Sequence, residues 1–293
     1  MHPVVLAHGF FGFAEMAGIE YFKDVKDHLQ RKFPGLRVIV TEVAPNDLIQ
    51  ERGLQLWAQI ERIGEKVHII GHSMGGLDSR FMISPAGLDK SERVASLTTI
   101  STSHRGSPIA DFIMEQGKEF GLQDVDRFTA KLPSLNREAR KIVKALGRRG
   151  EIWRHLLEFS NLTRGGLQDL ICSSMRQFNE KYHDAPEVKY SSYAGVSGPG
   201  EKDRLPPVIY IPWAVVFLNN DESCGGRNDG IVAVNSARWG DFKGEIPADH
   251  FKQVGHDLSG MGWLRKLLFW KKSFNHLGFF EKIVQDLNDL EST

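Results

Sequence analysis

The sequence predicts an α/β fold in which helices flank a mostly parallel β-sheet. Short apolar runs rich in β-branched residues alternate with helical patterns, which is typical of βαβ units. A Gly-x-Ser-x-Gly turn follows one of these runs directly, and a long helical insertion later interrupts the alternation. A chain of 293 residues, 41% hydrophobic and 25% charged, can bury one large core, so we expect a single domain with an insertion.

The predicted strands share a high content of β-branched residues. They span residues 3–7, 36–43, 66–70, 93–101 and 189–196. Apolar residues at helical spacing separate the first three runs: Phe22, Val25, Leu29 and Phe33, then Leu54, Trp57, Ile60 and Ile63. Helices are therefore expected between successive strands, and neighbouring strands are expected to be parallel.

Residues 108–188 form the predicted insertion, a helical lid or cap without a strand candidate of useful length. Two apolar series run through it: Ile142, Val143, Leu146, Ile152, Trp153, Leu156 and Leu157, then Leu167, Leu170, Ile171, Met175 and Phe178. Packing onto the core and a mobile lid that offers apolar surface to lipid are alternative interpretations of both series. Residues 198–228 are rich in Gly and Pro, which predicts loop, and the last thirty residues suggest closing helices.

The composition argues against several classes of protein. Lys plus Arg and Asp plus Glu number 37 each, so no net field would recruit nucleic acid or an anionic membrane surface. No apolar stretch approaches the roughly 18 residues of a transmembrane helix. The first residues show no basic segment followed by an apolar one, which predicts a cytoplasmic location. Secretion by a route that reads no N-terminal signal, or earlier removal of a leader, is the alternative.

Residues 71–75, Gly-His-Ser-Met-Gly, follow a predicted strand and precede a helical segment. In a strand–turn–helix elbow the serine occupies a strained turn, and the two glycines allow the strand and the helix to approach closely. The turn lifts the Ser73 hydroxyl above the sheet edge, where N–H groups of the helix N-terminus lie behind it. A glycine-rich turn with an incidental serine is the alternative, but the flanking strand and helix favour Ser73 as a nucleophile.

An acyl-transfer nucleophile needs backbone N–H groups that stabilise the oxyanion. One of these usually belongs to the residue after the nucleophile, here Met74. The loop 8–12 follows the first strand, and its glycines let the N–H of Phe10 face the serine, so Phe10 is the second expected donor. Simple packing of this loop is the alternative to an apolar acyl pocket formed by its neighbours Phe11, Phe13 and Met16.

A serine hydroxyl needs a neighbouring imidazole as base, and a carboxylate holds that imidazole in the right tautomer. Asp229, in an Asn-Asp-Gly turn, and His250 follow Ser73 in the order nucleophile, acid, base that this type of elbow uses. Chain order does not separate His250 from the rival base His256, although the polar loop around His250 suits a catalytic base better. The remaining rivals are the histidine His276 and the carboxylates of Asp221, Asp241 and Asp249.

The residues described above lie in the segments 6–13, 71–80, 228–232 and 249–254. Together these segments resemble the bacterial triacylglycerol lipases of the Pseudomonas, Burkholderia and Proteus type, and residues 178–182 are similar to the segment that follows the lid in that family. The resemblance implies an α/β-hydrolase fold that lacks the first two strands of larger members. It also implies a triad of Ser73, Asp229 and His250, favours His250 over His256, and assigns Phe10 and Met74 as oxyanion donors.

The chain departs from these lipases at two places. The resemblance implies a structural calcium ion bound by an aspartate two residues after the catalytic histidine, but Lys252 stands there and would repel a metal. The second aspartate of that site has no clear counterpart in residues 205–210, so we expect no metal. The disulfide of the family is not expected either, because Cys224 precedes Asp229; the sequence leaves open whether Cys172 and Cys224 pair.

The sequence thus predicts a carboxylic ester hydrolase, most simply a triacylglycerol lipase that acts on fatty acyl esters through an acyl-enzyme. The expected partner is a lipid or ester substrate. A short-chain carboxylesterase, a phospholipase and an acyltransferase would use the same residues and are alternatives within the same chemistry. A hydrolase fold that binds without catalysis is the alternative from a different class.

Overall fold

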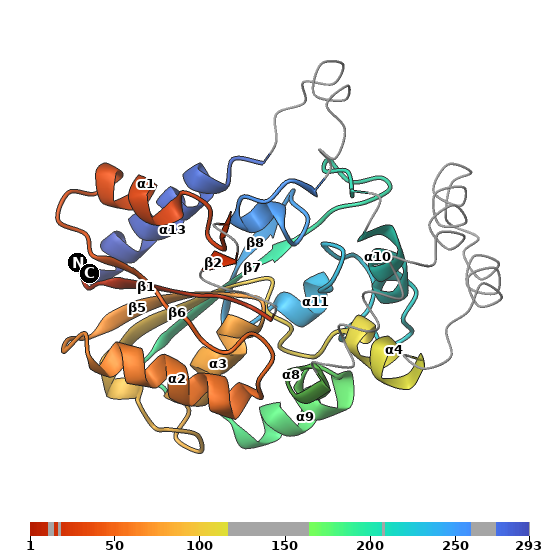
Figure 1. Cartoon of the computed structure of the whole chain (residues 1–293), viewed down its shortest axis with the longest axis horizontal. Helices are drawn as coiled ribbons and strands as arrows, with labels where there is room; N and C mark the ends of the chain where they lie inside the picture. The colour runs from red at the N-terminus through yellow and green to blue at the C-terminus, as the bar shows by residue number, and fades with distance from the viewer. Residues whose placement is uncertain (11–14, 17–18, 117–163, 207–208, 259–273, 293) are drawn as a thin grey trace.

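A six-stranded sheet forms the centre of the protein (Figure 1). The computed structural model describes residues 1–10, 15–16, 19–116, 164–206, 209–258 and 274–292. The spatial order of the strands is β4-β1-β5-β6-β7-β8, and every neighbouring pair is parallel. The strands are β1 (Val4–Ala7), β4 (Val38–Val40), β5 (Val67–His72), β6 (Val94–Ile100), β7 (Lys189–Gly195) and β8 (Asp241–Ile246). The predicted mostly parallel sheet is therefore confirmed.

Helices cover both faces of this sheet (Figure 1). Helices α1 (Val25–Lys32) and α13 (His276–Glu291) pack on one face, and α2 (Ile49–Glu61) and α3 (Met74–Ile83) pack on the other. Strand β1 shows how the sequence produces these layers, because successive side chains of a strand point to opposite faces. Val4 and Leu6 join the core beneath α1 and α13, whereas Val5 and Ala7 join the core beneath α2.

The closing helix α13 follows from its sequence in the same way. Its buried residues recur at helical spacing: Phe279, Phe280, Ile283, Val284 and Leu287. The Asn275 side chain caps the first turn by accepting a hydrogen bond from the Gly278 N–H at 3.1 Å. The helix ends beside the chain start, where Glu291 lies 3.4 Å from the Met1 amino group.

The remaining described helices gather around the carboxyl ends of the strands (Figure 1). They are α4 (Pro108–Gln116), α8 (Arg164–Asp169), α9 (Cys172–Lys181), α10 (Tyr210–Phe217) and α11 (Val234–Ala237). A separate two-stranded antiparallel sheet, β2 (Glu15–Met16) with β3 (Ile19–Glu20), follows the loop after β1. No helix in the described part of the chain is long and apolar enough to cross a membrane.

Strand β8 and helix α10 are the longest elements that differ from the sequence prediction. Strand β8 was not expected, because it is a polar edge strand whose side chains are largely exposed, so it contains no apolar run. Helix α10 lies within the segment 198–228 that was predicted as loop, and this prediction was wrong. Pro212 is tolerated there because it occupies the first turn, where its missing N–H breaks no helical hydrogen bond.

The described ends of the predicted insertion pack onto the core. Leu167, Leu170, Met175 and Phe178 are buried in one cluster with Met74 and Leu77 of α3. The second apolar series therefore has a packing role, whereas the first series, residues 142–157, lies outside the described residues. Helix α9 begins at Cys172, whose buried thiol lies 2.6 Å from the buried sulfur of Cys224.

Candidate active site

The predicted nucleophile lies in a sharp turn between β5 and α3. Ser73 has φ 54° and ψ −130°, a backbone conformation that a non-glycine residue rarely adopts. The flanking glycines are required by close packing. A Cβ atom on Gly71 would lie 2.7 Å from the Gly76 nitrogen, and one on Gly75 would lie 2.3 Å from the Ala7 carbonyl oxygen. The strained turn and the missing side chains together form the elbow that the motif predicts.

The loop after β1 lies directly against this serine. Strand pairing places Ala7 opposite Gly71, so the loop and the turn leave the sheet side by side. A Cβ atom on Gly9 would lie 2.5 Å from the Ser73 Cβ and 3.0 Å from its Oγ. The backbone at Gly9 therefore packs directly against Ser73, as expected for a loop that carries an oxyanion donor.

The other residues predicted around the serine are placed in part. Met74 is the first residue of α3 and is fully buried. The Phe10 side chain packs against the cluster that contains Met74 and Leu77. Met16 belongs to strand β2, whereas Phe11 and Phe13 lie outside the described residues, so the predicted acyl pocket stays a prediction.

Asp229 and His250 contact each other directly. The Nδ1 atom of His250 lies 2.8 Å from the Oδ2 atom of Asp229, and the His250 N–H donates to the Asp229 carbonyl oxygen at 3.0 Å. The other carboxylate oxygen accepts the N–H groups of Ile231 and Val232 at 3.0 and 2.9 Å. Burial by itself would raise the pKa of Asp229, but the charge of His250 and these hydrogen bonds outweigh it and lower the pKa.

His250 also lies close to the elbow. Its ring is 4.6 Å from the ring of His72, the residue before the serine. Within the described parts of the chain, no hydrogen bond joins the Ser73 hydroxyl to His250. Catalytic hydrogen bonds are often long in an enzyme without substrate, so the absence of this contact does not exclude the pair.

The rival residues are occupied elsewhere. His256 Nε2 lies within 3.0 Å of the Glu20 and Tyr21 carbonyl oxygens, and His276 Nε2 lies 2.9 Å from the Lys23 carbonyl oxygen. The rival carboxylates pair with cations rather than with His250: Asp221 with Arg176, Asp241 with Lys243 and Asp249 with Lys252. Geometry therefore favours Asp229 and His250 over each rival that the sequence left open.

Lys252 occupies the position where the resemblance implied a metal-binding aspartate. Its ammonium lies 2.8 Å from Asp203 Oδ1, 2.9 Å from Asp249 Oδ2 and 3.0 Å from the Arg204 carbonyl oxygen. Asp203 lies just before residues 205–210, where the sequence offered no second aspartate. A calcium ion is bound by six to eight oxygen ligands, whereas the oxygens of Asp203, Asp249 and Arg204 here surround an ammonium group.

The Lys252 ammonium stays protonated at neutral pH. Burial by itself would lower the pKa of the ammonium, but the carboxylates of Asp249 and Asp203 outweigh burial and raise it. Asp249 also accepts the N–H groups of Phe251 and Lys252, both at 3.0 Å. The residues on both sides of His250 are thus fixed by one buried ion-pair cluster.

Three residues around Asp229 and the elbow were not predicted from the sequence. Gln253 Nε2 donates to Asp229 Oδ2 at 2.8 Å, and Tyr21 Oη lies 2.7 Å from His72 Nδ1. Asp203 completes the ion pairs of Lys252. Gln253 lies within the segment 249–254 that resembles the bacterial lipases, but its role was not predicted; no pattern marks Tyr21 or Asp203, because the fold alone brings them near their partners.

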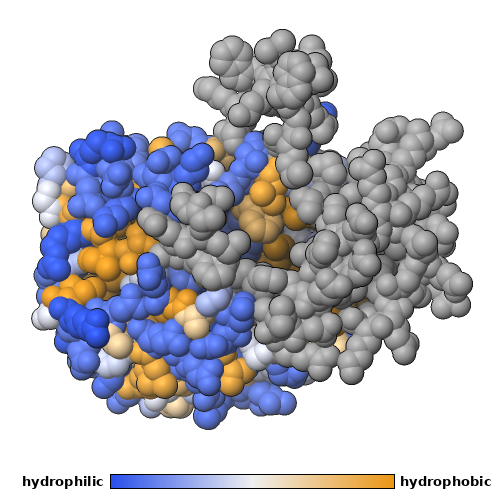
Figure 2. All heavy atoms as spheres, in the orientation of Figure 1, coloured by the Kyte–Doolittle hydropathy of each residue, from blue (hydrophilic) through white to orange (hydrophobic). Residues whose placement is uncertain are grey.

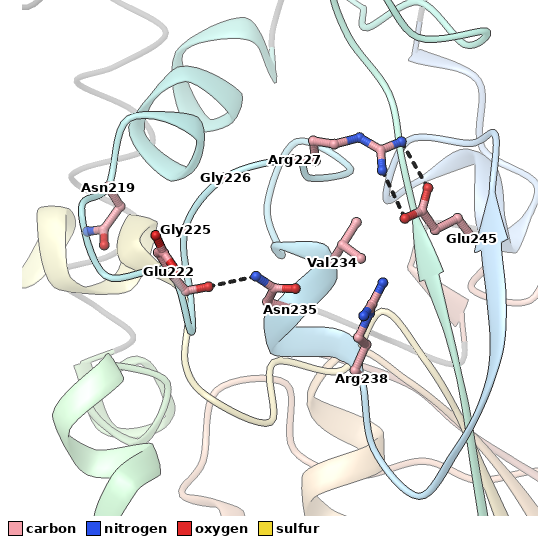
Figure 3. A pocket seen from close by; sticks show the side chains of 9 residues that line it. All are labelled: Asn219, Glu222, Gly225, Gly226, Arg227, Val234, Asn235, Arg238 and Glu245. Carbon is pink, nitrogen blue, oxygen red and sulfur yellow. Dashed lines mark hydrogen bonds and ion pairs between the residues drawn. The ribbon is translucent and has the colours of Figure 1, made fainter.

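A separate pocket lies between the α10–α11 connection and β8 (Figure 3). Its polar groups already have partners: Arg227 pairs with Glu201 and Glu245, and Asn235 donates to the Glu222 carbonyl oxygen at 2.8 Å. Arg238 stacks on Phe242, 4.6 Å from the ring centroid. The pocket contains none of the predicted site residues, and we assign it no role.

Comparison with solved structures shows the fold. The structure of Staphylococcus hyicus lipase superposes with a TM-score of 0.67 and 18% sequence identity, over 100% of this chain and 97% of that one. A likeness at this level of identity concerns the backbone alone. The central sheet with its elbow is therefore an α/β-hydrolase fold, as the sequence predicted.

Comparison with curated sequences bears on the family as well as on the fold. Triacylglycerol lipase 2 of Saccharomyces cerevisiae is 32% identical over 294 residues, which covers 94% of this chain and 75% of that protein. A triacylglycerol lipase of Vibrio cholerae is 38% identical over 117 residues, which covers 38% of this chain and 36% of that protein. Residues 45–127 also match the family described as the PGAP1-like alpha/beta domain.

Proposed function

Since the chain belongs to the triacylglycerol lipases of the α/β-hydrolase superfamily, and so is an enzyme that hydrolyses ester bonds, we propose that Ser73, His250 and Asp229 carry out this hydrolysis. The observation that carries the proposal is the 2.8 Å contact between Asp229 and His250 beside the strained Ser73 turn. A carboxylate on Nδ1 leaves Nε2 of His250 as the nitrogen that can accept a proton from serine.

The proposed reaction follows from this arrangement. Ser73 Oγ attacks the ester carbonyl carbon while His250 Nε2 takes the hydroxyl proton, and the carbonyl oxygen becomes an oxyanion. The N–H groups of Phe10 and Met74 stabilise that oxyanion. His250 then protonates the leaving alcohol, and the carbonyl is restored as an acyl-enzyme. Water attacks this ester with His250 again as base, which releases the acid and frees Ser73.

Fatty acyl esters, including triacylglycerols, are the proposed substrates. Figure 2 shows apolar side chains gathered in a hollow near the middle of the face that it draws, and an apolar hollow suits an acyl chain. The insertion 108–188 is proposed as a helical lid or cap; its described ends pack on α3, and residues 117–163 lie outside the described residues. The motifs that resemble the bacterial type support a Pseudomonas- and Burkholderia-like arrangement of the elbow and the loop after β1.

We also propose that the enzyme needs no calcium. Lys252 stands where the resemblance implied a calcium-binding aspartate, and its ammonium pairs with Asp203 and Asp249. His250, two residues away, would then be held in place by the protein's own cation.

The test is hydrolysis of p-nitrophenyl esters from acetyl to palmitoyl, with emulsified triolein alongside. The expected result is turnover that extends to palmitoyl and triolein and falls by at least about 10³-fold in Ser73→Ala, since the hydroxyl forms the acyl-enzyme. His256→Gln is the matched control and should retain activity. Turnover confined to short chains would leave a carboxylesterase, and activity that survives in Ser73→Ala would refute the assigned nucleophile.

A further inference from the structure

A continuous row of hydrogen bonds joins the loop after β1 to Asp229. The Gly9 N–H donates to Tyr21 Oη at 3.1 Å, and Tyr21 Oη lies 2.7 Å from His72 Nδ1. On the other side of the imidazole, His72 Nε2 lies 3.2 Å from Gln253 Oε1, and Gln253 Nε2 donates to Asp229 Oδ2 at 2.8 Å. His72, at the centre of this row, directly precedes Ser73 in the elbow.

The two ends of this row fix the direction of every hydrogen bond. A backbone N–H only donates and an ionised carboxylate only accepts. Gln253 must therefore turn its NH₂ group to Asp229 and its carbonyl oxygen to His72, so His72 carries its proton on Nε2. His72 Nδ1 is then an acceptor, and the Tyr21 hydroxyl donates to it while accepting from Gly9. All four donors point the same way, towards the acid.

The surroundings support one protonation state for the row. Burial, aided by the nearby charge of His250, lowers the pKa of His72 well below its ordinary value, so the ring is neutral. Burial also raises the pKa of Tyr21, which keeps its hydroxyl protonated. The second N–H of Gln253 is directed to the Ala248 carbonyl oxygen at 3.4 Å, which agrees with the assigned orientation of the amide. Flipping the amide would set its oxygen against a carboxylate.

We propose that Tyr21, His72 and Gln253 form a positioning relay that holds the oxyanion loop and the catalytic acid in register with each other. At one end the relay fixes Gly9, whose backbone abuts Ser73 and precedes the oxyanion donor Phe10. At the other end it holds the carboxylate that orients His250. The inference rests on the proposed roles of Ser73, Asp229 and His250, and it adds that the two halves of the site are positioned together.

A relay differs from simple satisfaction of buried polar groups in what a break would do. If each hydrogen bond only stabilised the fold, the effects of breaking it at Tyr21 and at Gln253 on kcat would be independent of each other. The two side chains do not touch the same atom, because they contact opposite sides of the His72 ring. In a relay, a break at one end leaves His72 free to tilt or change tautomer, so a second break has less left to remove. Non-additive effects on kcat therefore distinguish the two.

The experiment compares Tyr21→Phe, Gln253→Met and the double variant, with kcat and KM measured on p-nitrophenyl butyrate across pH. Each single variant is expected to lower kcat about 10-fold with KM within about 2-fold, because a positioning defect acts on the transition state. The double variant is expected to lower kcat about 20-fold rather than 100-fold, since coupled residues are not additive. Thr41→Val is the matched control: it removes a buried hydrogen bond to the Leu6 carbonyl oxygen, outside the relay, and should leave kcat unchanged.

The pH profile gives a second readout. Among the residues that the structure describes, the titratable side chains of Asp229 and His72 contact His250, and Asp249 and Lys252 flank it on its own loop. Gln253→Met removes one of the hydrogen bonds that lower the pKa of Asp229, so the pKa of that carboxyl should rise. Because the ionised carboxylate orients the base, the acidic limb of the kcat/KM profile should move to higher pH, and it should stay in place in Thr41→Val.

Two results would overturn the relay: unchanged kcat in both single variants, or a double variant whose loss equals the product of the single losses. Tyr21→Phe removes a single atom and supplies the test if Gln253→Met does not fold, since the relay then requires a lower kcat in Tyr21→Phe than in Thr41→Val. Failure of the proposed function would look different, because Ser73→Ala would then retain activity.

Discussion

The nucleophile half and the acid–base half of the site are positioned by different means. Ser73 is placed by backbone packing, since glycines on either side of it bring β5, α3 and the end of β1 into contact. His250 and Asp229 lie in loops, and side-chain contacts hold them: Gln253 binds the acid, and the ion pairs of Lys252 with Asp203 and Asp249 fix the loop of the base. The position of Ser73 thus depends on glycines that lack a side chain, whereas the positions of Asp229 and His250 depend on side-chain hydrogen bonds and ion pairs.

This difference predicts how each half fails. An added side-chain atom in the elbow would clash with backbone atoms, and these cannot move without disturbing the sheet. A lost side chain near His250 leaves unpaired polar groups, but the loops retain some freedom to expose them to water. Substitutions in the elbow should therefore damage the fold more than substitutions in the loops.

The largest effect is expected for Gly75→Ala. Its Cβ would lie 2.3 Å from the Ala7 carbonyl oxygen and 2.7 Å from that of His8, so the end of β1 must shift. We expect the free energy of unfolding to fall by about 3 kcal/mol or more, measured by urea denaturation. The control is Gly165→Ala in α8, where the nearest atom is 3.6 Å away, and where stability should be unchanged or slightly higher. Equal stability of the two variants would contradict the packing account of the elbow.

A smaller effect is expected for Lys252→Met, which leaves Asp203 and Asp249 facing each other without a cation. We expect a loss of about 2 kcal/mol in unfolding free energy, less than for a fully buried pair because Asp203 is 15% exposed. Lys243→Met is the control, since the Lys243–Asp241 pair is exposed and should contribute less than about 1 kcal/mol.

The same pair of variants tests whether Lys252 takes the place of a metal. Wild-type activity should survive dialysis against EDTA and gain nothing from added calcium, whereas Lys252→Met should lose activity through displacement of the His250 loop. Loss of wild-type activity on chelation, with recovery on adding calcium, would show that the ammonium does not replace the ion.

Sequence predicted the elbow well because everything that defines it is local. Residues 71–75, at the junction of a strand and a helix, specify the strained turn, and the glycines allow the close packing around it. The acid and the base were predicted from chain order and motif similarity, with rivals that only the geometry could set aside. The choice of Asp229 over Asp249, for example, depends on which carboxylate faces the imidazole.

The contacts that the sequence did not predict join residues that lie far apart along the chain. Tyr21 meets His72 across 51 residues, and Gln253 meets His72 across 181. Such pairs leave no periodic or local pattern in a single sequence. Strand β8 was missed for a related reason, because an edge strand is stabilised by its neighbour β7 and needs no apolar run of its own.

The most direct test of the account is reaction with an alkyl fluorophosphonate followed by mass spectrometry of the digested protein. A serine reacts with this reagent when a neighbouring base activates it, as the Asp229–His250 pair is proposed to do for Ser73. The account predicts one adduct per chain, on the peptide that contains Ser73, and no adduct in Ser73→Ala. An active enzyme that is labelled on another serine, or not labelled at all, would contradict it.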